Sequence, residues 1–170
     1  KQGADGIELD VHVTKDGEVV VTHDEKIDRV SNGSGFIKDM TLRELKRLSF
    51  HNHMESYVGA GIPTLREVLE YVSTTNMDVN IELKTGIYWY PQIEEKTAFI
   101  VQETGMHDRV IYSSFNHHSI AKIKEIDSTA ETAWLFSDVI LNVEQYAKAN
   151  GVEGLHPAVY HMYMSDFMKR

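Results

Sequence analysis

The sequence of 170 residues contains no cysteine, which excludes disulfide bonds, thiolate zinc sites and a cysteine nucleophile. It has no apolar run near the roughly 18 residues that a membrane-spanning helix needs, so we expect no stable membrane insertion. Basic residues are fewer than acidic ones, 17 against 26, and the net charge is −9 at pH 7. Because nucleic-acid backbones and anionic membrane surfaces bind to basic faces, neither is expected as a partner.

The sequence also lacks two signatures of common phosphate and ester chemistry. No serine lies in a nucleophile-elbow pattern, and no glycine-rich phosphate loop precedes a predicted helix. Apolar residues at 42% and charged residues at 25% are ordinary globular values, so we expect a packed core. The chemistry is therefore sought among carboxylates and histidines.

Residues 6–13 alternate strictly between apolar and polar side chains, which is the pattern of a β-strand. One face of this strand carries Ile7, Leu9, Val11 and Val13, and the other carries Glu8, Asp10 and His12. Residues 79–84 repeat the arrangement, with Asn80, Glu82 and Lys84 on the polar face. Two such strands suggest a barrel that helices cover on the outside and whose charged residues line a site.

Strands and helices alternate at a spacing of roughly 25 residues, which is typical of βα units around a parallel sheet. We expect strands at 6–13, 18–22, 79–84, 109–113, 132–136 and 152–156. We expect helices at about 41–48, 64–72, 92–104, 117–126 and 143–149, the first two opened by capping boxes. The predicted fold class is α/β: an incomplete (β/α)8 TIM barrel with about strands 2 to 6 of the eight.

No linker divides the chain, so residues 1–170 are expected to form one domain with a small loop-rich insertion at 25–62. Lys1 to Gly3 resembles the end of a helix with glycine at its C′ position. A last helix is expected after Pro157, capped at Ser165 and continuing to Arg170. Both chain ends would then interrupt elements, and we expect a fragment of a longer protein.

Glu8, Asp10 and Glu82 lie near the C-terminal ends of neighbouring predicted strands, where (β/α)8 barrels place their sites. Three carboxylates in a partly enclosed site repel one another, and Ca²⁺ or Mg²⁺ with oxygen ligands relieves that repulsion. We therefore predict a divalent-cation site on these three residues. The alternative is a set of solvated carboxylates without a metal.

Three further residues are candidates for the same site. His23 follows a predicted strand directly and can exchange a proton near neutral pH, although a capping or surface histidine is the alternative. Lys84 would place a positive charge beside a bound anion, or it lies on the surface. Phe115, like Ser114 and His156, ends a predicted strand and is expected to line the pocket, with ordinary packing as the alternative.

Other histidines and aromatic residues are interpreted more conservatively. The pairs His51/His53 and His117/His118 have no nearby carboxylate or cysteine, so we interpret them as loop or helix-cap histidines. Residues 88–90, Tyr-Trp-Tyr, follow the strand that carries Lys84. They are candidates to cover an alcohol, to pack on the insertion, or to contact a second subunit in a possible homo-oligomer.

Several motifs together resemble the glycerophosphodiester phosphodiesterase family in order and spacing. They are residues 3–11 (GADGIELDV), 14–17 (TKDG), 23–24 (HD), Arg29, 32–35 (NGSG), 62–65 (IPTL) and 81–84 (IELK). The resemblance covers nearly the whole chain. It implies a (β/α)8 barrel with residues 25–62 as the family's small insertion. It also implies metal-dependent hydrolysis of a small-molecule glycerophosphodiester to sn-glycerol 3-phosphate and an alcohol.

By this resemblance, Glu8, Asp10 and Glu82 match the metal ligands, and Lys84 matches a phosphate-contacting lysine. His23 matches one of two acid/base histidines. The family's His-Arg-Gly motif, which supplies the other histidine and a phosphate-binding arginine, does not occur in the sequence. We expect that motif upstream of the chain and the last two barrel strands downstream of it.

Three alternatives to glycerophosphodiester hydrolysis stay open at this point. The first is a lipid phosphodiesterase of the lysophospholipase D or sphingomyelinase D type, which a wide apolar mouth would favour. The second is a catalytically silent member that binds a glycerophosphodiester or a protein. The third is a carboxylate-rich barrel without a metal.

Overall fold

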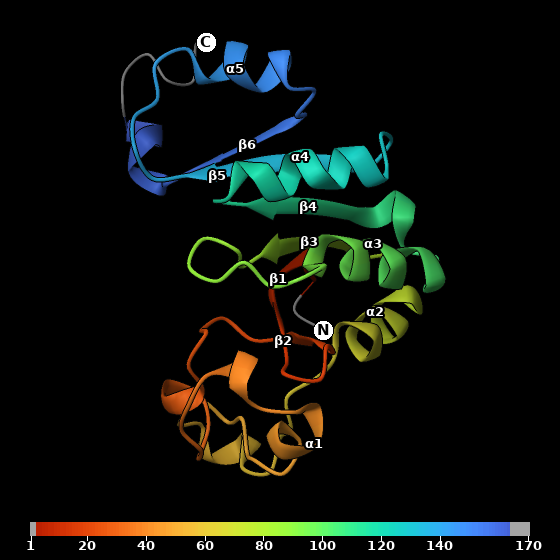
Figure 1. Cartoon of the computed structure of the whole chain (residues 1–170), viewed down its shortest axis with the longest axis vertical. Helices are drawn as coiled ribbons and strands as arrows, with labels where there is room; N and C mark the ends of the chain where they lie inside the picture. Colours follow the sequence, from red (N-terminus) through yellow and green to blue (C-terminus); the bar gives the residue numbers. More distant parts are fainter. Residues whose placement is uncertain (1–2, 164–170) are drawn as a thin grey trace.

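The computed structural model describes residues 3–163, and Figure 1 shows the arrangement of its elements. The strands are β1 (Gly6–Val13), β2 (Val19–Val21), β3 (Asp78–Leu83), β4 (Val110–Ser114), β5 (Glu131–Phe136) and β6 (Gly154–Pro157). They form one sheet in the order β2-β1-β3-β4-β5-β6. The helix end expected at Lys1–Gln2 and the helix expected from Ser165 lie outside the described residues.

Five of the six strands run parallel to one another: β1, β3, β4, β5 and β6. The remaining strand, β2, pairs with β1 in the antiparallel direction. Within residues 3–163 the sheet is open, since β2 and β6 are its two edges. The predicted α/β class with an incomplete barrel is therefore confirmed. The predicted turn between β1 and β2 is also present, and Gly17 adopts the left-handed φ of 89° that favours glycine.

The α-helices are α1 (Leu42–Leu45), α2 (Leu65–Ser73), α3 (Ile93–Glu103), α4 (His117–Ile126) and α5 (Val143–Ala149). Both predicted capping boxes are present: Thr41 pairs with Glu44, and Thr64 pairs with Glu67. The first helix is shorter than predicted, because only Leu42–Leu45 is α-helical. After Pro157 the described chain forms a 3-10 helix, η5 (Val159–Tyr163).

Helix α3 packs against α2 on one side and α4 on the other, and the three helices lie along one face of the sheet (Figure 1). The apolar face of the strands meets these helices in the main core, which includes Leu9, Ile81, Leu83, Ile93 and Ile120. That burial accounts for the apolar half of the alternation in β1 and β3. The polar half faces away from the helices and is available to build a site.

The insertion forms a separate lobe beside the β1–β2 hairpin (Figure 1). It contains α1 and the 3-10 helices η1 (Ile27–Arg29), η2 (Ile37–Asp39) and η3 (Glu55–Tyr57). The 3-10 helix η4 (His107–Arg109) is not part of the insertion and precedes β4. Its own small core contains Val20, Ile27, Ile37, Leu45 and Ile62. Among the helices described, none is long and apolar enough to cross a membrane.

Candidate active site

The three predicted carboxylates lie together on the polar face of β1 and β3. Because these strands are parallel and in register, Asp10 is paired with Glu82, and Glu8 lies one pleat earlier, opposite Asn80. One oxygen from each of Glu8, Asp10 and Glu82 lies within 4.8 Å of the others. Asp10 and Glu82 are buried, and Glu8 is exposed.

Lys84 extends from the end of β3 into the same group. Its Nζ lies 3.1 Å from a Glu82 oxygen and 3.5 Å from an Asp10 oxygen. Burial raises the pKa of Glu82, and Lys84 offsets that rise only in part. Glu8 is exposed by residue area, but the partial desolvation of its carboxyl group by neighbouring side chains raises its pKa, and the nearby Asp10 raises it further. Ionisation of these carboxyl groups is therefore costly at this place, and Lys84 alone does not remove that cost.

The donor set suits a hard divalent cation. Two oxygens on one Ca²⁺ at about 2.4 Å each are at most about 4.8 Å apart, and the three oxygens already lie within 4.8 Å of one another. All three donors are carboxylates, which Ca²⁺ and Mg²⁺ prefer over nitrogen or sulfur. In residues 3–163 this is the one cluster of its kind found. Glu8, Asp10 and Glu82 therefore fit an ion of this class.

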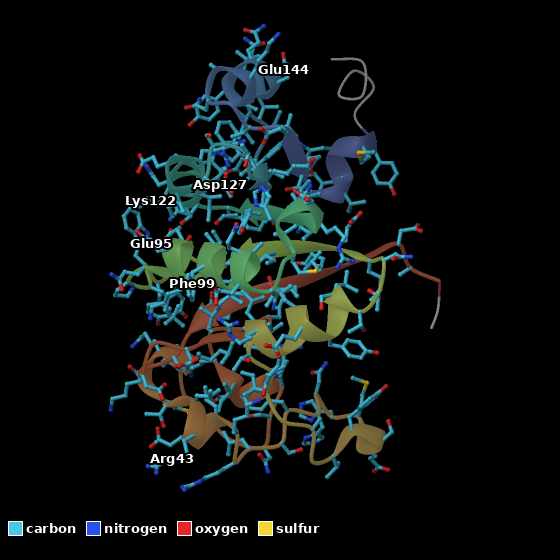
Figure 2. All side chains as sticks on the ribbon, turned by 90° about the vertical axis from the view of Figure 1, so that its right-hand side faces the viewer. Arg43, Glu95, Phe99, Lys122, Asp127 and Glu144 are labelled. Atoms are coloured by element: carbon cyan, nitrogen blue, oxygen red, sulfur yellow. The ribbon has the colours of Figure 1, made fainter. Side chains whose placement is uncertain are left out.

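Lys84→Met is expected to destabilise the protein in chelator by about 2 kcal/mol, because two buried carboxylates lose their cationic partner. For a chain of this length that corresponds to a fall in Tm of about 4–8 °C. The matched control is Lys122→Met, which removes a half-exposed lysine whose Nζ lies 3.8 Å from Glu95 and 3.4 Å from Glu125 (Figure 2). That change is expected to cost less than about 1 kcal/mol. Equal Tm values for the two variants would contradict the role assigned to Lys84.

His23 follows β2, and the hairpin folds it back toward the carboxylates. The N–H of Thr22 donates to the carbonyl oxygen of Asp10 at 3.1 Å, which ties the end of the hairpin to a predicted metal ligand. The His23 side chain is 67% exposed, so it is accessible to a reactant. Its charge also acts on the pKa of Glu8. The structure therefore brings His23 to the carboxylate cluster.

Two residues orient the imidazole, and sequence reasoning had assigned a role to neither. His23 Nδ1 lies 2.5 Å from Asp24 Oδ1, and Arg29 donates to both Asp24 oxygens at 2.7 and 2.9 Å. The hydrogen bonds from Arg29 lower the pKa of Asp24 to about 2, so Asp24 is an ionised acceptor. With Nδ1 donating to Asp24, Nε2 is the atom that can exchange a proton. The adjacent His23-Asp24 pair was the sequence signal for this arrangement.

The other predicted strand-end residues have different surroundings. Phe115 follows β4 and is half exposed, whereas Ser114 is buried and donates to the carbonyl oxygen of Leu83 at 2.7 Å. His156 is half-buried on β6, and burial lowers its pKa. Within residues 3–163, no hydrogen bond or ion pair joins these three residues to the carboxylate cluster. Their placement at strand ends is confirmed, and a role in binding stays a prediction.

The histidine pairs and the aromatic loop pack as structural elements. His51 and His53 have ring centroids 6.4 Å apart, and His117 stacks on the buried Trp134 at 4.3 Å. Tyr88 packs edge-on against Phe36 of the insertion at 5.8 Å. For Tyr88, the packing alternative is therefore confirmed. Trp89 in the same loop is 73% exposed.

A cavity of about 190 Å³ lies outside the carboxylate cluster, between the loop after β3 and the helices α3 and α4. Its walls include Thr85, Trp89, Glu94 and Ser119. None of the three carboxylates lines it. The candidate site is therefore defined by the chemistry of the polar sheet face rather than by this cavity.

A family model described as the glycerophosphoryl diester phosphodiesterase family matches residues 1–169. A glycerophosphodiester phosphodiesterase from Caldanaerobacter subterraneus subsp. tengcongensis is 43% identical over 161 residues, covering 94% of this chain and 66% of that protein. One from Bacillus altitudinis is 45% identical over 159 residues, covering 92% of this chain and 65% of that protein. The chain thus spans just under two thirds of the length of these relatives.

Solved structures show the same fold. A glycerophosphodiester phosphodiesterase from Agrobacterium tumefaciens superimposes with a TM-score of 0.82 at 27% identity, covering 99% of this chain and 70% of that one. An Oleispira antarctica phosphodiesterase in complex with the product sn-glycerol-3-phosphate superimposes with a TM-score of 0.85 at 26% identity, with the same coverage of 99% and 70%. The open sheet of this chain therefore corresponds to part of a larger (β/α)8 architecture.

Proposed function

Because the chain belongs to the glycerophosphoryl diester phosphodiesterase family, we propose that its protein hydrolyses glycerophosphodiesters to sn-glycerol 3-phosphate and an alcohol. The observation that carries this proposal is the cluster of Glu8, Asp10 and Glu82, together with His23, which is held by Asp24 and follows Thr22, whose N–H donates to the carbonyl oxygen of Asp10. The product named for the Oleispira antarctica structure supports the proposed product.

Glu8, Asp10 and Glu82 would hold Ca²⁺ or Mg²⁺, and the bound ion would neutralise charge on the phosphate oxygens. The ammonium of Lys84 lies within 3.5 Å of two of these carboxylates. It would bind a phosphate oxygen and stabilise the charge that develops in the transition state.

His23 would exchange a proton at Nε2 while Asp24 holds Nδ1. In a two-histidine mechanism, one imidazole accepts a proton from the attacking oxygen and the other donates a proton to the departing alkoxide. The sequence contains no His-Arg-Gly motif for the second histidine. Since the chain spans only 66% of a close relative, the reaction is proposed for the complete protein.

The proposed activity is tested by release of glycerol 3-phosphate from glycerophosphocholine by the complete protein. Release is expected with Ca²⁺ or Mg²⁺ and is expected to stop in excess chelator, because the carboxylates would lose their ion. Restoring the cation should restore release. Release that chelator does not affect would contradict the metal site, and no release from any glycerophosphodiester would contradict the function.

A lipid substrate is the second candidate, and one observation favours it. Exposed apolar side chains lie on the loops that follow β3, β4 and β5, at the end of the sheet where the carboxylates gather. They are Ile87, Trp89, Phe115, Val139 and Leu141. Faster choline release from lysophosphatidylcholine than from glycerophosphocholine would favour this candidate. Binding without release of either alcohol would favour a silent binding protein.

A further inference from the structure

His12 on β1 is fully buried, and both of its ring nitrogens lie close to a hydrogen-bonding partner. Its Nδ1 lies 3.0 Å from the hydroxyl oxygen of Tyr90, and its Nε2 lies 3.3 Å from the backbone carbonyl oxygen of His23. The rings of His12 and Tyr90 meet edge to face, with centroids 5.7 Å apart and an interplanar angle of 81°. One buried side chain thus links Tyr90, 78 positions further along the chain, to the backbone of the proposed acid/base histidine.

The chemistry of these two contacts defines the tautomer of His12. A carbonyl oxygen only accepts hydrogen bonds, so Nε2 carries the proton that is donated to His23. Nδ1 then accepts from the Tyr90 hydroxyl. A neutral ring that donates on one side and accepts on the other leaves neither buried nitrogen without a partner.

The packing around Tyr90 fixes the position of the hydroxyl group that contacts His12. Tyr90 is buried, and it lies three residues before the start of α3, near the end of the loop that begins at Lys84. Tyr88 in the same loop lies 6.3 Å from the Tyr90 ring and 5.8 Å from Phe36 of the insertion. The loop is thus packed against the insertion on one side and hydrogen-bonded to β1 on the other.

His23 itself lacks such packing, because its side chain is mostly exposed. Asp24 fixes the ring through Nδ1, and Asp24 in turn is held by Arg29. These contacts orient the imidazole relative to its own loop. The position of that loop relative to Asp10 depends on contacts of its backbone, which include the hydrogen bond from Thr22 to Asp10 and the one from the His12 side chain to the His23 carbonyl oxygen.

We propose that His12 and Tyr90 are a pair of positioning residues that fixes the backbone of His23 and thereby holds its imidazole near the carboxylates. The catalytic consequence of this inference rests on the proposed function, while the positioning itself does not. Neither residue touches the reactants in this scheme. Both act through His23, whose misplacement by about 1 Å is enough to slow an enzyme by roughly 100-fold.

The positioning is tested without reference to activity by long-range ¹H–¹⁵N NMR spectra of the complete protein, labelled at histidine. The ring signal that disappears in His12→Gln is expected to have the pattern of a neutral imidazole protonated at Nε2. Tyr90→Phe is expected to shift the ring signals of His23 and to leave those of His107 unchanged. A His12 ring that is protonated at Nδ1, or His23 ring signals that do not shift in Tyr90→Phe, would overturn the proposal.

The matched control for the tyrosine is Tyr112→Phe. Tyr112 is also buried, but it lies on β4 opposite Ile81, on the helix-covered face of the sheet. Removing its hydroxyl is expected to leave the His23 signals in place. A shift of those signals equal to that in Tyr90→Phe would show a general response to core substitution and would overturn the positioning role.

The catalytic consequence is tested by steady-state kinetics on glycerophosphocholine. His12→Asn and Tyr90→Phe are expected to lower kcat roughly ten-fold with little change in KM, because the proton-transferring group moves while substrate contacts stay. His12→Gln, whose amide can donate from near the position of Nε2, is expected to retain most of kcat. If His12→Asn does not fold, as judged by circular dichroism, Tyr90→Phe carries the test.

The outcomes separate the two proposals. An active wild type together with unchanged kcat in the folded variants would overturn the positioning role and leave the proposed function intact. A wild type that hydrolyses no glycerophosphodiester would overturn the proposed function, and the His23 signals in Tyr90→Phe would still decide whether the pair positions that residue.

Discussion

Glu82→Gln is expected to lower metal-dependent release of glycerol 3-phosphate by roughly 100-fold or more, since it removes one of three proposed ligands. Glutamine keeps the size and an oxygen acceptor, so the change removes charge without opening a cavity. The position is sensitive because Glu82 is buried on β3 and paired in register with Asp10. Both kcat/KM and its dependence on cation concentration are to be measured with the complete protein.

The same variant predicts a second result that does not involve turnover. At a cation concentration about 100 times Kd, binding stabilises the wild type by about 2.7 kcal/mol, which for a chain of this length corresponds to a Tm gain of about 5–10 °C. Most of this gain is expected to vanish in Glu82→Gln.

The control for this variant is Glu95→Gln, because Glu95 is an exposed residue of α3 that pairs only weakly with Lys122 (Figure 2). It is expected to keep both the activity and the cation-dependent gain in Tm. An undiminished gain in Glu82→Gln would mean that the cation binds elsewhere.

His23→Ala is expected to lower kcat by roughly 10²–10⁴-fold, which is the usual contribution of a general acid or base. The side chain is largely exposed and lies outside both hydrophobic cores, so the Tm should hardly change. Added imidazole should restore part of the rate, because the exposed site leaves room for it. Asp24→Asn is expected to have a smaller effect of the same kind, since it removes the ionised acceptor of Nδ1.

A second histidine–aspartate pair provides the matched control. His107 Nδ1 lies 3.2 Å from Asp127 Oδ2, and Asp127, labelled in Figure 2, is the C-cap residue of α4. His107→Ala removes a similar histidine–aspartate pair that does not contact Glu8, Asp10 or Glu82. The variant is expected to leave kcat unchanged. If both histidine variants lost activity equally, the effect of His23→Ala would reflect structure rather than proton transfer.

Local sequence patterns were sufficient to predict most of the elements and part of the site. The alternation in residues 6–13 and 79–84 identified β1 and β3, and the capping boxes marked the starts of α1 and α2. Such patterns depend only on neighbouring residues and on whether one face of an element is buried. The same alternation placed Glu8, Asp10 and Glu82 on the polar faces of these two strands. Their chemistry then suggested a cation.

The contacts that complete the site depend on segments that are distant along the chain. Only the paired register of β1 and β3 brings Asp10 beside Glu82, and only the antiparallel turn into β2 returns His23 to Asp10. The contact of His12 with Tyr90 spans 78 residues, and no local pattern encodes it. The sequence by itself determined which residues could do the chemistry. The tertiary structure decided which of them meet, because strand register and loop packing are properties of the assembled core.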